Sequence, residues 1–140
     1  MDALDLRTAP PRSGRAELAG IVFLPRTIDK ARATLPGGNS GEYRMQGFSE
    51  RFLDTVGIPV ADFTTAVAGA SSDDDVVRFL RASTSPEKIA EWNDFILQRQ
   101  PSGGDREAAY TNYPWLRERP DLILALDVLE EDDRRLFATP

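Results

Sequence analysis

The sequence predicts an all-α fold, a single small domain of about six short helices within residues 1–140. Three observations support this prediction. Apolar residues recur at helical spacing in several segments, and breaks rich in glycine, proline and serine separate these segments. The chain has no series of alternating strands and no Asn-Gly or Asp-Gly hairpin signal. Its length of 140 residues is typical of one domain.

An extended arm is expected at the beginning of the chain, over about residues 1–15. Residues 7–15 contain two adjacent prolines and no apolar side chain larger than alanine, which is typical of extended backbone. Such an arm is ordered only where it is tied to the rest of the domain. Pairing of its arginines with carboxylates of the body would provide that tie, and these arginines are Arg7, Arg12 and Arg15.

The first helix is expected over residues 16–35, with a kink at Pro25. Apolar residues follow one helical face there, and the proline removes the hydrogen-bond donor that the carbonyl of Ile21 would need. An alternative is a short buried strand over residues 18–24. Its only visible partner is the segment 42–46, and two such strands do not make a stable sheet, which favours the helix.

The start of each further helix is marked by a capping residue or by a proline. Gly57 and Gly69 are expected to end the second and third helices, and Pro114 to break the helix that begins at Asp105. The expected starts are Ser49, Pro59, Ser72, Ser85–Pro86 and Asp105, followed by a last helix with Leu122, Ile123, Leu126 and Leu129. The expected core residues include Val60, Phe63, Val67, Val76, Phe79, Leu80, Ile89, Trp92, Phe95 and Ile96.

Cysteine and histidine are both absent from the sequence, and the net charge is −6. Without those residues the chain has no disulfide, thiol nucleophile, structural zinc site or iron–sulfur ligand set. The acidic runs 73–75 and 130–133 lack the alternating ligands and central glycine of a calcium loop. We therefore expect no metal and no cofactor. The overall acidity also argues against general nucleic-acid binding.

A cytoplasmic location without membrane association is expected. The longest apolar run, residues 18–25, is far shorter than the roughly 20 residues that span a bilayer. The first residues are acidic, whereas the start of a signal peptide is basic.

Residues 1–47 carry a net charge of +2, whereas residues 48–140 carry a net charge of −8. On a helix over residues 16–35, Arg26, Asp29 and Arg32 follow one another at three-residue steps, which predicts a ladder with Asp29 between two guanidinium groups. Arg26 and Lys30 are like charges four residues apart, an unfavourable pair unless an anion lies between them. The pattern predicts either a small-anion site or a structural ion-pair network that includes carboxylates of the acidic region.

A glycine-rich loop follows the expected first helix and continues into Gly41, Glu42 and Tyr43. Its backbone N–H groups are suited to an anion, although the loop contains neither a P-loop nor a GxGxxG motif. The alternative interpretation is a flexible turn whose Tyr43 side chain lies against the core.

Four motifs in the first 60 residues resemble a known family: PPRSGR, LAGIVFLPRTIDKARATLPG, GEYR and RFLDTVGI. The sequence resembles the bacterial domain-of-unknown-function family 5069, and IAEWNDF is the best matching piece of the remainder. Because this family has no established activity, the resemblance implies no mechanism. It does imply that one group of polar residues belongs together, for folding or for function. These residues are Arg12, Arg15, Arg26, Asp29, Lys30, Arg32, Glu42 and Tyr43.

Three functions remain open for this polar group. The first is a soluble binding or interaction module that holds a small anionic molecule or an acidic segment of a protein partner. The second is a small enzyme in which Lys30 acts with Glu42 or Asp29 and with Tyr43 in acid–base chemistry. The third is a purely structural or dimerising protein. The burial of Lys30 distinguishes them, because a partly exposed lysine that faces a pocket favours a ligand or substrate and a fully paired one favours structure.

Overall fold

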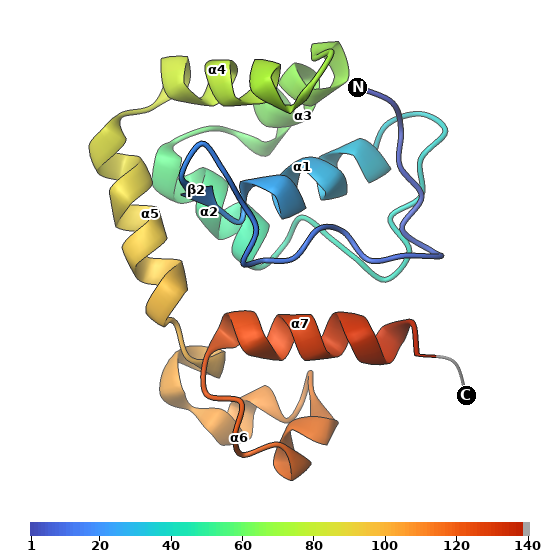
Figure 1. Cartoon of the computed structure of the whole chain (residues 1–140), viewed down its shortest axis with the longest axis vertical. Helices are drawn as coiled ribbons and strands as arrows, with labels where there is room; N and C mark the ends of the chain where they lie inside the picture. Colours follow the sequence, from blue (N-terminus) through green and yellow to red (C-terminus); the bar gives the residue numbers. More distant parts are fainter. Residues whose placement is uncertain (139–140) are drawn as a thin grey trace. The chain divides into compact units, whose positions relative to one another are not determined.

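Helices make up most of the chain, as the sequence predicted, and one two-stranded sheet is added to them (Figure 1). The computed structural model describes residues 1–138. Its internal contacts divide the chain into two compact units, Met1–Asn93 and Asp94–Pro140, so that a single domain over the whole chain stays a prediction. Within residues 1–138, every helix is too short or too polar to span a bilayer.

The region expected to form one kinked helix over residues 16–35 is instead a hairpin followed by a helix. Strand β1 (Glu17–Leu18) pairs antiparallel with β2 (Ile21–Val22), and α1 (Leu24–Ala33) begins two residues later. Pro25 lies in the first turn of α1, where its missing N–H has no intrahelical partner to lose. The predicted kink is therefore wrong, because no helix precedes the proline.

Side chains of a later helix stabilise this two-stranded sheet, although two short strands were expected to be unstable by themselves. Ala19 and Gly20 form the hairpin turn with φ of 52° and 79°, a left-handed backbone that suits glycine and tight hairpins. The Trp92 indole N–H donates to the Val22 carbonyl at 2.8 Å. The Asn93 side chain accepts from Val22 N–H and donates to the Gly20 carbonyl. Long-range hydrogen bonds thus supply the stability that a lone hairpin lacks.

The N-terminal arm is extended and lies beside the loop that follows α1. Leu6 N–H donates to the carbonyl of Asn39 at 2.8 Å, and Asn39 N–H donates to the carbonyl of Leu4 at 3.0 Å. Gly41 in the same loop has a φ of +56°, and a Cβ added there would lie 2.9 Å from the Leu6 carbonyl oxygen. This close approach requires glycine at position 41.

Four more helices complete the first unit and begin the second. They are α2 (Phe48–Val56), α3 (Val60–Gly69), α4 (Asp73–Ser83) and α5 (Pro86–Gln98). Gly57 ends α2 in the left-handed conformation with a φ of 75°, as predicted.

The predicted cap at Ser49 is wrong, because the N-cap of α2 is Gly47. Ser49 lies inside the helix, where its buried hydroxyl accepts a hydrogen bond from the Thr27 hydroxyl of α1 at 3.1 Å. This hydroxyl pair satisfies two buried polar groups at the α1–α2 contact.

Trp92 occupies the centre of the core of the first unit. Its side chain is fully buried, and its ring centroid lies 5.9 Å from that of Phe23 and 5.2 Å from that of Phe52. The predicted core is confirmed at Phe63, Val67, Val76, Leu80, Trp92 and Ile96, which are fully buried. Val60, Phe79, Ile89 and Phe95 are only partly buried.

The second unit contains short helical turns and one longer helix. Its elements after α5 are η1 (Pro101–Gly104), α6 (Arg106–Ala109), η2 (Pro114–Glu118) and α7 (Ala125–Leu136). The prediction that Asp105 caps a helix is confirmed, because its carboxylate accepts from Ala108 N–H at 3.2 Å. The prediction of a last helix from Leu122 is correct in type but too early in start, and Ile123 is 52% exposed rather than buried. The acidic run 130–133 lies within α7.

Candidate functional site

An ion-pair network joins the N-terminal arm to the first unit. The guanidinium of Arg12 donates to both carboxylate oxygens of Asp29 on α1, at 3.0 to 3.2 Å, and to both oxygens of Asp73 at the start of α4, at 2.7 and 3.2 Å. The backbone N–H of Arg12 also donates to Asp29, at 2.8 Å. One arginine therefore ties the arm to two helices that are distant in sequence.

This network has the character of a structural element. The Asp29 side chain is 6% exposed, and that of Arg12 is 38% exposed. Hydrogen bonding to Asp73, and then to Asp29, raises the pKa of Arg12 above its usual value. Because the Arg12 guanidinium binds two carboxylates at once, its positive charge is already compensated within the fold.

The predicted ladder along α1 is only partly present. Arg32 Nη1 lies 3.9 Å from Asp29 Oδ1, and Arg32 Nε donates to the carbonyl of Asp2 at 2.8 Å. The bidentate partner of Asp29 is Arg12, which comes from the arm and not from the helix. Helical spacing identified the right carboxylate, but it did not identify this long-range partner.

Arg26 is almost completely buried, with 2% exposure, and lies among aromatic rings. Its guanidinium carbon is 5.9 Å from the Phe23 ring centroid and 5.4 Å from that of Tyr43, and Nη1 donates to the Arg12 carbonyl at 3.3 Å. Such cation–π contacts fix both partners. Arg26 thus holds the Tyr43 ring in place at the edge of the pocket described next.

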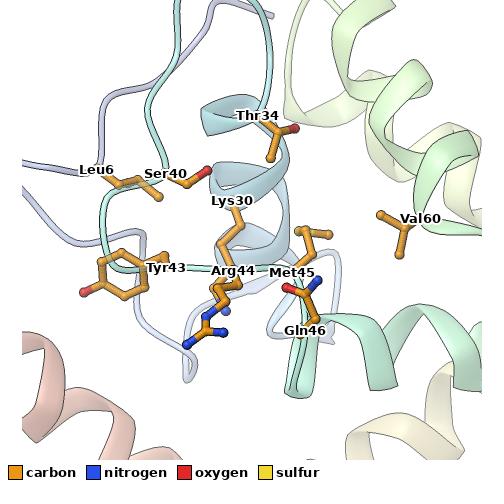
Figure 2. Close-up of a pocket in the computed structure, with 9 residues that line it drawn as sticks. All are labelled: Leu6, Lys30, Thr34, Ser40, Tyr43, Arg44, Met45, Gln46 and Val60. Atoms are coloured by element: carbon orange, nitrogen blue, oxygen red, sulfur yellow. The ribbon is translucent and has the colours of Figure 1, made fainter.

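Lys30 extends from α1 into a pocket of about 370 Å³ in the first unit. Figure 2 shows the Lys30 side chain running from the helix toward the 43–46 segment, with Tyr43 on one side and Val60 of α3 on the other. Among the described residues that line the pocket, two carry a positive charge and none carries a negative charge. The lining residues are Leu6, Lys30, Thr34, Ser40, Tyr43, Arg44, Met45, Gln46 and Val60.

The two cations of the pocket differ in their surroundings. Lys30 is 9% exposed, and its Nζ lies 5.8 Å from the Phe23 ring centroid. Arg44 is exposed on the loop between α1 and α2, and no carboxylate within residues 1–138 pairs with it. The pocket thus combines a buried ammonium group with a guanidinium that retains its full donor fork.

Neutral polar groups of the same loop complete the lining. Ser40 and Gln46 contribute a hydroxyl and an amide, and Tyr43 contributes its ring and phenol. A turn closed by Tyr43 N–H donating to the Ser40 carbonyl at 2.9 Å sets the path of this loop. The Asn39 side chain supports it by accepting from Gly41 N–H at 2.9 Å. Hydrogen bonds within the loop therefore set the shape of this part of the pocket wall.

The predicted polar group divides into three sets in the structure. Arg12, Asp29 and Arg32 belong to the ion-pair network, and Arg26 is buried beside it. Lys30 and Tyr43 line the pocket. The other two members lie apart from the pocket lining: Arg15, which is exposed and whose N–H donates to Ser13 Oγ at 3.1 Å, and Glu42, which is exposed on the loop.

Sequence reasoning missed the second cation of the pocket. Arg44 directly follows Tyr43 and is the last residue of the GEYR motif, so the signal was present in the sequence. Leu6, Met45 and Val60 gave no such signal, because the fold brings them together from the arm, the loop and α3. Within residues 1–138, carboxylate side chains form no group of three that is arranged to hold a metal ion.

A family model described as "Domain of unknown function (DUF5069)" matches residues 8–135, which is nearly the whole chain. The match confirms the resemblance found in the motifs of the first 60 residues and extends it through the second unit. No curated protein matches the chain.

Proposed function

Because the chain belongs to the family described as "Domain of unknown function (DUF5069)", whose description names no activity, we propose a function from the pocket itself. The protein is a binding module for a small anion, which is held between Lys30 and Arg44. The observation that carries this proposal is the charge of the pocket lining, with two cations and no carboxylate among the described residues.

An anion held between the two cations of the pocket would be attracted by the positive charge of both. Lys30 is largely buried, so an anion beside it interacts in a medium of lower effective dielectric constant than water. Arg44 adds a planar fork that matches carboxylate and phosphate oxygens. The chain as a whole is acidic, which makes this local positive field specific to the pocket and not a general property of the surface.

The geometry supports the other two functions, a small acid–base enzyme and a purely structural protein, less well. Asp29 is bound by Arg12, and neither Asp29 nor Glu42 is among the described residues that line the pocket with Lys30. A structural role accounts for Arg12 and Asp29, which form the ion-pair network. It does not account for a pocket whose wall carries Lys30 and Arg44.

Thermal unfolding in a panel of phosphate, sulfate and carboxylate anions at constant ionic strength tests the proposal. An anion present at 100 times its Kd stabilises a protein by about 2.7 kcal/mol, which raises Tm measurably. We expect the increase in the wild type to be lost in Lys30→Met and in Arg44→Gln. Lys88→Met is the matched control, because Lys88 is the only other lysine and lies exposed on α5.

Two results would contradict the anion site. One is an absence of any anion-dependent increase in the wild type. The other is an increase that persists in both pocket variants to the same extent as in Lys88→Met, which would place the anion elsewhere on the molecule.

A further inference from the structure

Another pocket, of about 410 Å³, lies in the second unit, where α5 is followed by η1. Its described lining contains one cation, Arg99, and no carboxylate. The other lining residues are Phe95, Gln98, Gln100 and Gly103. The volume lies within the roughly 300–1,000 Å³ that is usual for pockets binding organic ligands.

Contacts with a ring and with the following loop position the guanidinium of Arg99. Its Cζ lies 5.4 Å from the Phe95 ring centroid, a cation–π contact. Gly103 has a φ of +66°, and a Cβ added there would lie 3.1 Å from Nη1 of Arg99 and 3.3 Å from Nη2. The backbone of Arg99 is anchored as well, because its carbonyl accepts from Ala125 N–H at 2.8 Å.

This positioned guanidinium has no hydrogen-bond acceptor within residues 1–138. Arg99 is half-buried, and its Nε is enclosed by protein without a partner. Its side chain forms no ion pair or hydrogen bond with the described residues. Arg106 in the same unit differs, because its guanidinium donates to the backbone carbonyls of Leu116, Arg119 and Leu122. Since polar groups inside proteins are normally hydrogen-bonded, the donors of Arg99 are suited to an acceptor supplied by another molecule.

The charge and shape of a single guanidinium favour a planar anion of charge −1. A carboxylate accepts two parallel hydrogen bonds from such a fork. Residues 94–140 contain ten acidic and six basic residues, a net charge of −4, which opposes a dianion more strongly than a monoanion. The exposed amides of Gln98 and Gln100 add hydrogen-bonding groups to the pocket without adding charge.

We propose that this pocket is a second binding site, which takes an organic monocarboxylate whose oxygens accept from Nη1 and Nη2 of Arg99. A small carboxylic acid and the C-terminus of a peptide both present this group. The proposal is independent of the anion pocket around Lys30, because the two pockets share no lining residue and belong to different units.

NMR titration of the full chain tests the proposal, with the Arg99 Nε–H signal and the backbone amide signals of residues 98–104 as the readout. The probes are N-acetylglycine, its uncharged analogue N-acetylglycinamide, and sulfate, at constant ionic strength and pH 6. The carboxylate is ionised at that pH, since an α-carboxyl pKa is about 3.5. We expect N-acetylglycine to shift these signals to saturation, sulfate to bind at least tenfold more weakly and N-acetylglycinamide to leave them unchanged.

Acetyl-tetraglycine with a free C-terminus distinguishes the two sources of the carboxylate. Tighter binding than that of N-acetylglycine supports a peptide C-terminus as the ligand, and weaker binding supports a small acid. Equal shifts with N-acetylglycine and N-acetylglycinamide would overturn the proposal, as would signals that do not respond to N-acetylglycine. Sulfate that bound as tightly as N-acetylglycine would overturn the preference for a carboxylate.

Arg99→Gln removes the fork and is expected to weaken the binding of N-acetylglycine at least tenfold. Arg117→Gln is the matched control, because Arg117 also lies on a ring in the second unit, 4.7 Å from the Tyr110 centroid, but outside this pocket. We expect Arg117→Gln and Lys30→Met to bind within twofold of the wild type. Equal binding by Arg99→Gln and Arg117→Gln would place the carboxylate elsewhere and overturn the site. If Arg99→Gln does not fold, the comparison of N-acetylglycine with N-acetylglycinamide in the wild type still decides.

Discussion

Asp29 and Lys30 are neighbours on α1, yet they belong to different parts of the molecule. Asp29 is bound by Arg12 of the arm and is enclosed in the ion-pair network, whereas Lys30 extends into the pocket. Successive residues of an α-helix point about 100° apart, because 3.6 residues complete one turn. Adjacent charges on one helix are therefore able to serve separate purposes.

The two regions also differ in how their charges are compensated. In the network, one arginine meets two carboxylates from α1 and α4, so that its charge is compensated within the fold. The described lining of the pocket contains two cations and no carboxylate. The ion-pair network and the proposed binding site therefore differ in the charges of the side chains that form them.

The largest expected effect tests the structural side of this comparison. Asp29→Asn removes the carboxylate that binds Arg12 and leaves the arm less firmly attached. We expect the free energy of unfolding to fall by about 2–3 kcal/mol, less than for a fully buried pair because the Arg12 side chain is 38% exposed. Urea unfolding measures this change.

Asp5→Asn is the matched control for Asp29→Asn, since Asp5 also binds an arginine, Arg7, but both side chains are exposed. We expect its urea midpoint to equal that of the wild type. If Asp29→Asn had an equally small effect, the network would not be a structural element.

A smaller effect is expected at the other end of the network. A double-mutant cycle with Arg12→Gln and Asp73→Asn isolates the coupling between these side chains. We expect a coupling of about 1 kcal/mol, because the Asp73 side chain is 27% exposed and water competes for its partner. A coupling of zero would show that Asp73 contributes only to the start of α4.

The second unit contains a carboxylate, Glu131, whose ionisation makes the stability of the protein depend on pH. Arg134, Arg135 and Arg119 contact the carboxylate of Glu131 on α7, and hydrogen bonding from Arg134 contributes most to lowering the Glu131 pKa from 4.5 to about 2. The ionised form is favoured by folding, so this stabilisation is present above the unfolded-state pKa and is lost as pH falls from 4.5 to about 2.

Glu131→Gln measures this pH dependence. We expect the free energy of unfolding to differ between wild type and variant by a constant amount above pH 5, and by a decreasing amount as pH falls toward 2. Urea unfolding at a series of pH values gives both curves. A difference that did not change with pH would mean that the charge of Glu131 is not the source of its stabilisation.

The smallest effect is expected in the empty pocket. Arg44→Gln removes an exposed cation that has no carboxylate partner within residues 1–138. We expect the free energy of unfolding to change by less than about 0.5 kcal/mol in the absence of anions. A loss above 1 kcal/mol would assign Arg44 a structural role and remove the contrast with Arg12 and Asp29.

Local patterns in the sequence were sufficient for most of the helices. Gly57 and Asp105 act at the helix ends as predicted, because a turn residue and a capping carboxylate act on backbone within a few residues of themselves. The helical core stripes around Val76 and Trp92 were predictable for the same reason, since a helix repeats its faces over short distances. The extended arm followed from its two prolines and lack of apolar side chains.

The hairpin before α1 was not predictable from its own residues. Its strands are two residues long and depend on hydrogen bonds from Trp92 and Asn93, about 70 positions later in the chain. The partners of Asp29 and Asp73 were not predictable either, because both carboxylates bind an arginine that is distant in sequence. Arg12 lies 17 residues from Asp29 and 61 residues from Asp73.

The sequence alone determined the helical class, the positions of most helix ends and the chemistry that the absence of cysteine and histidine excludes. It also indicated that Lys30 and Tyr43 belong to one polar group. Only the tertiary structure placed Arg44 and Val60 in one pocket with Lys30, while Asp29 turned toward the arm. The physical reason is that propensities and caps act within one helical turn, whereas a pocket and its charge depend on which distant segments the packed fold brings together.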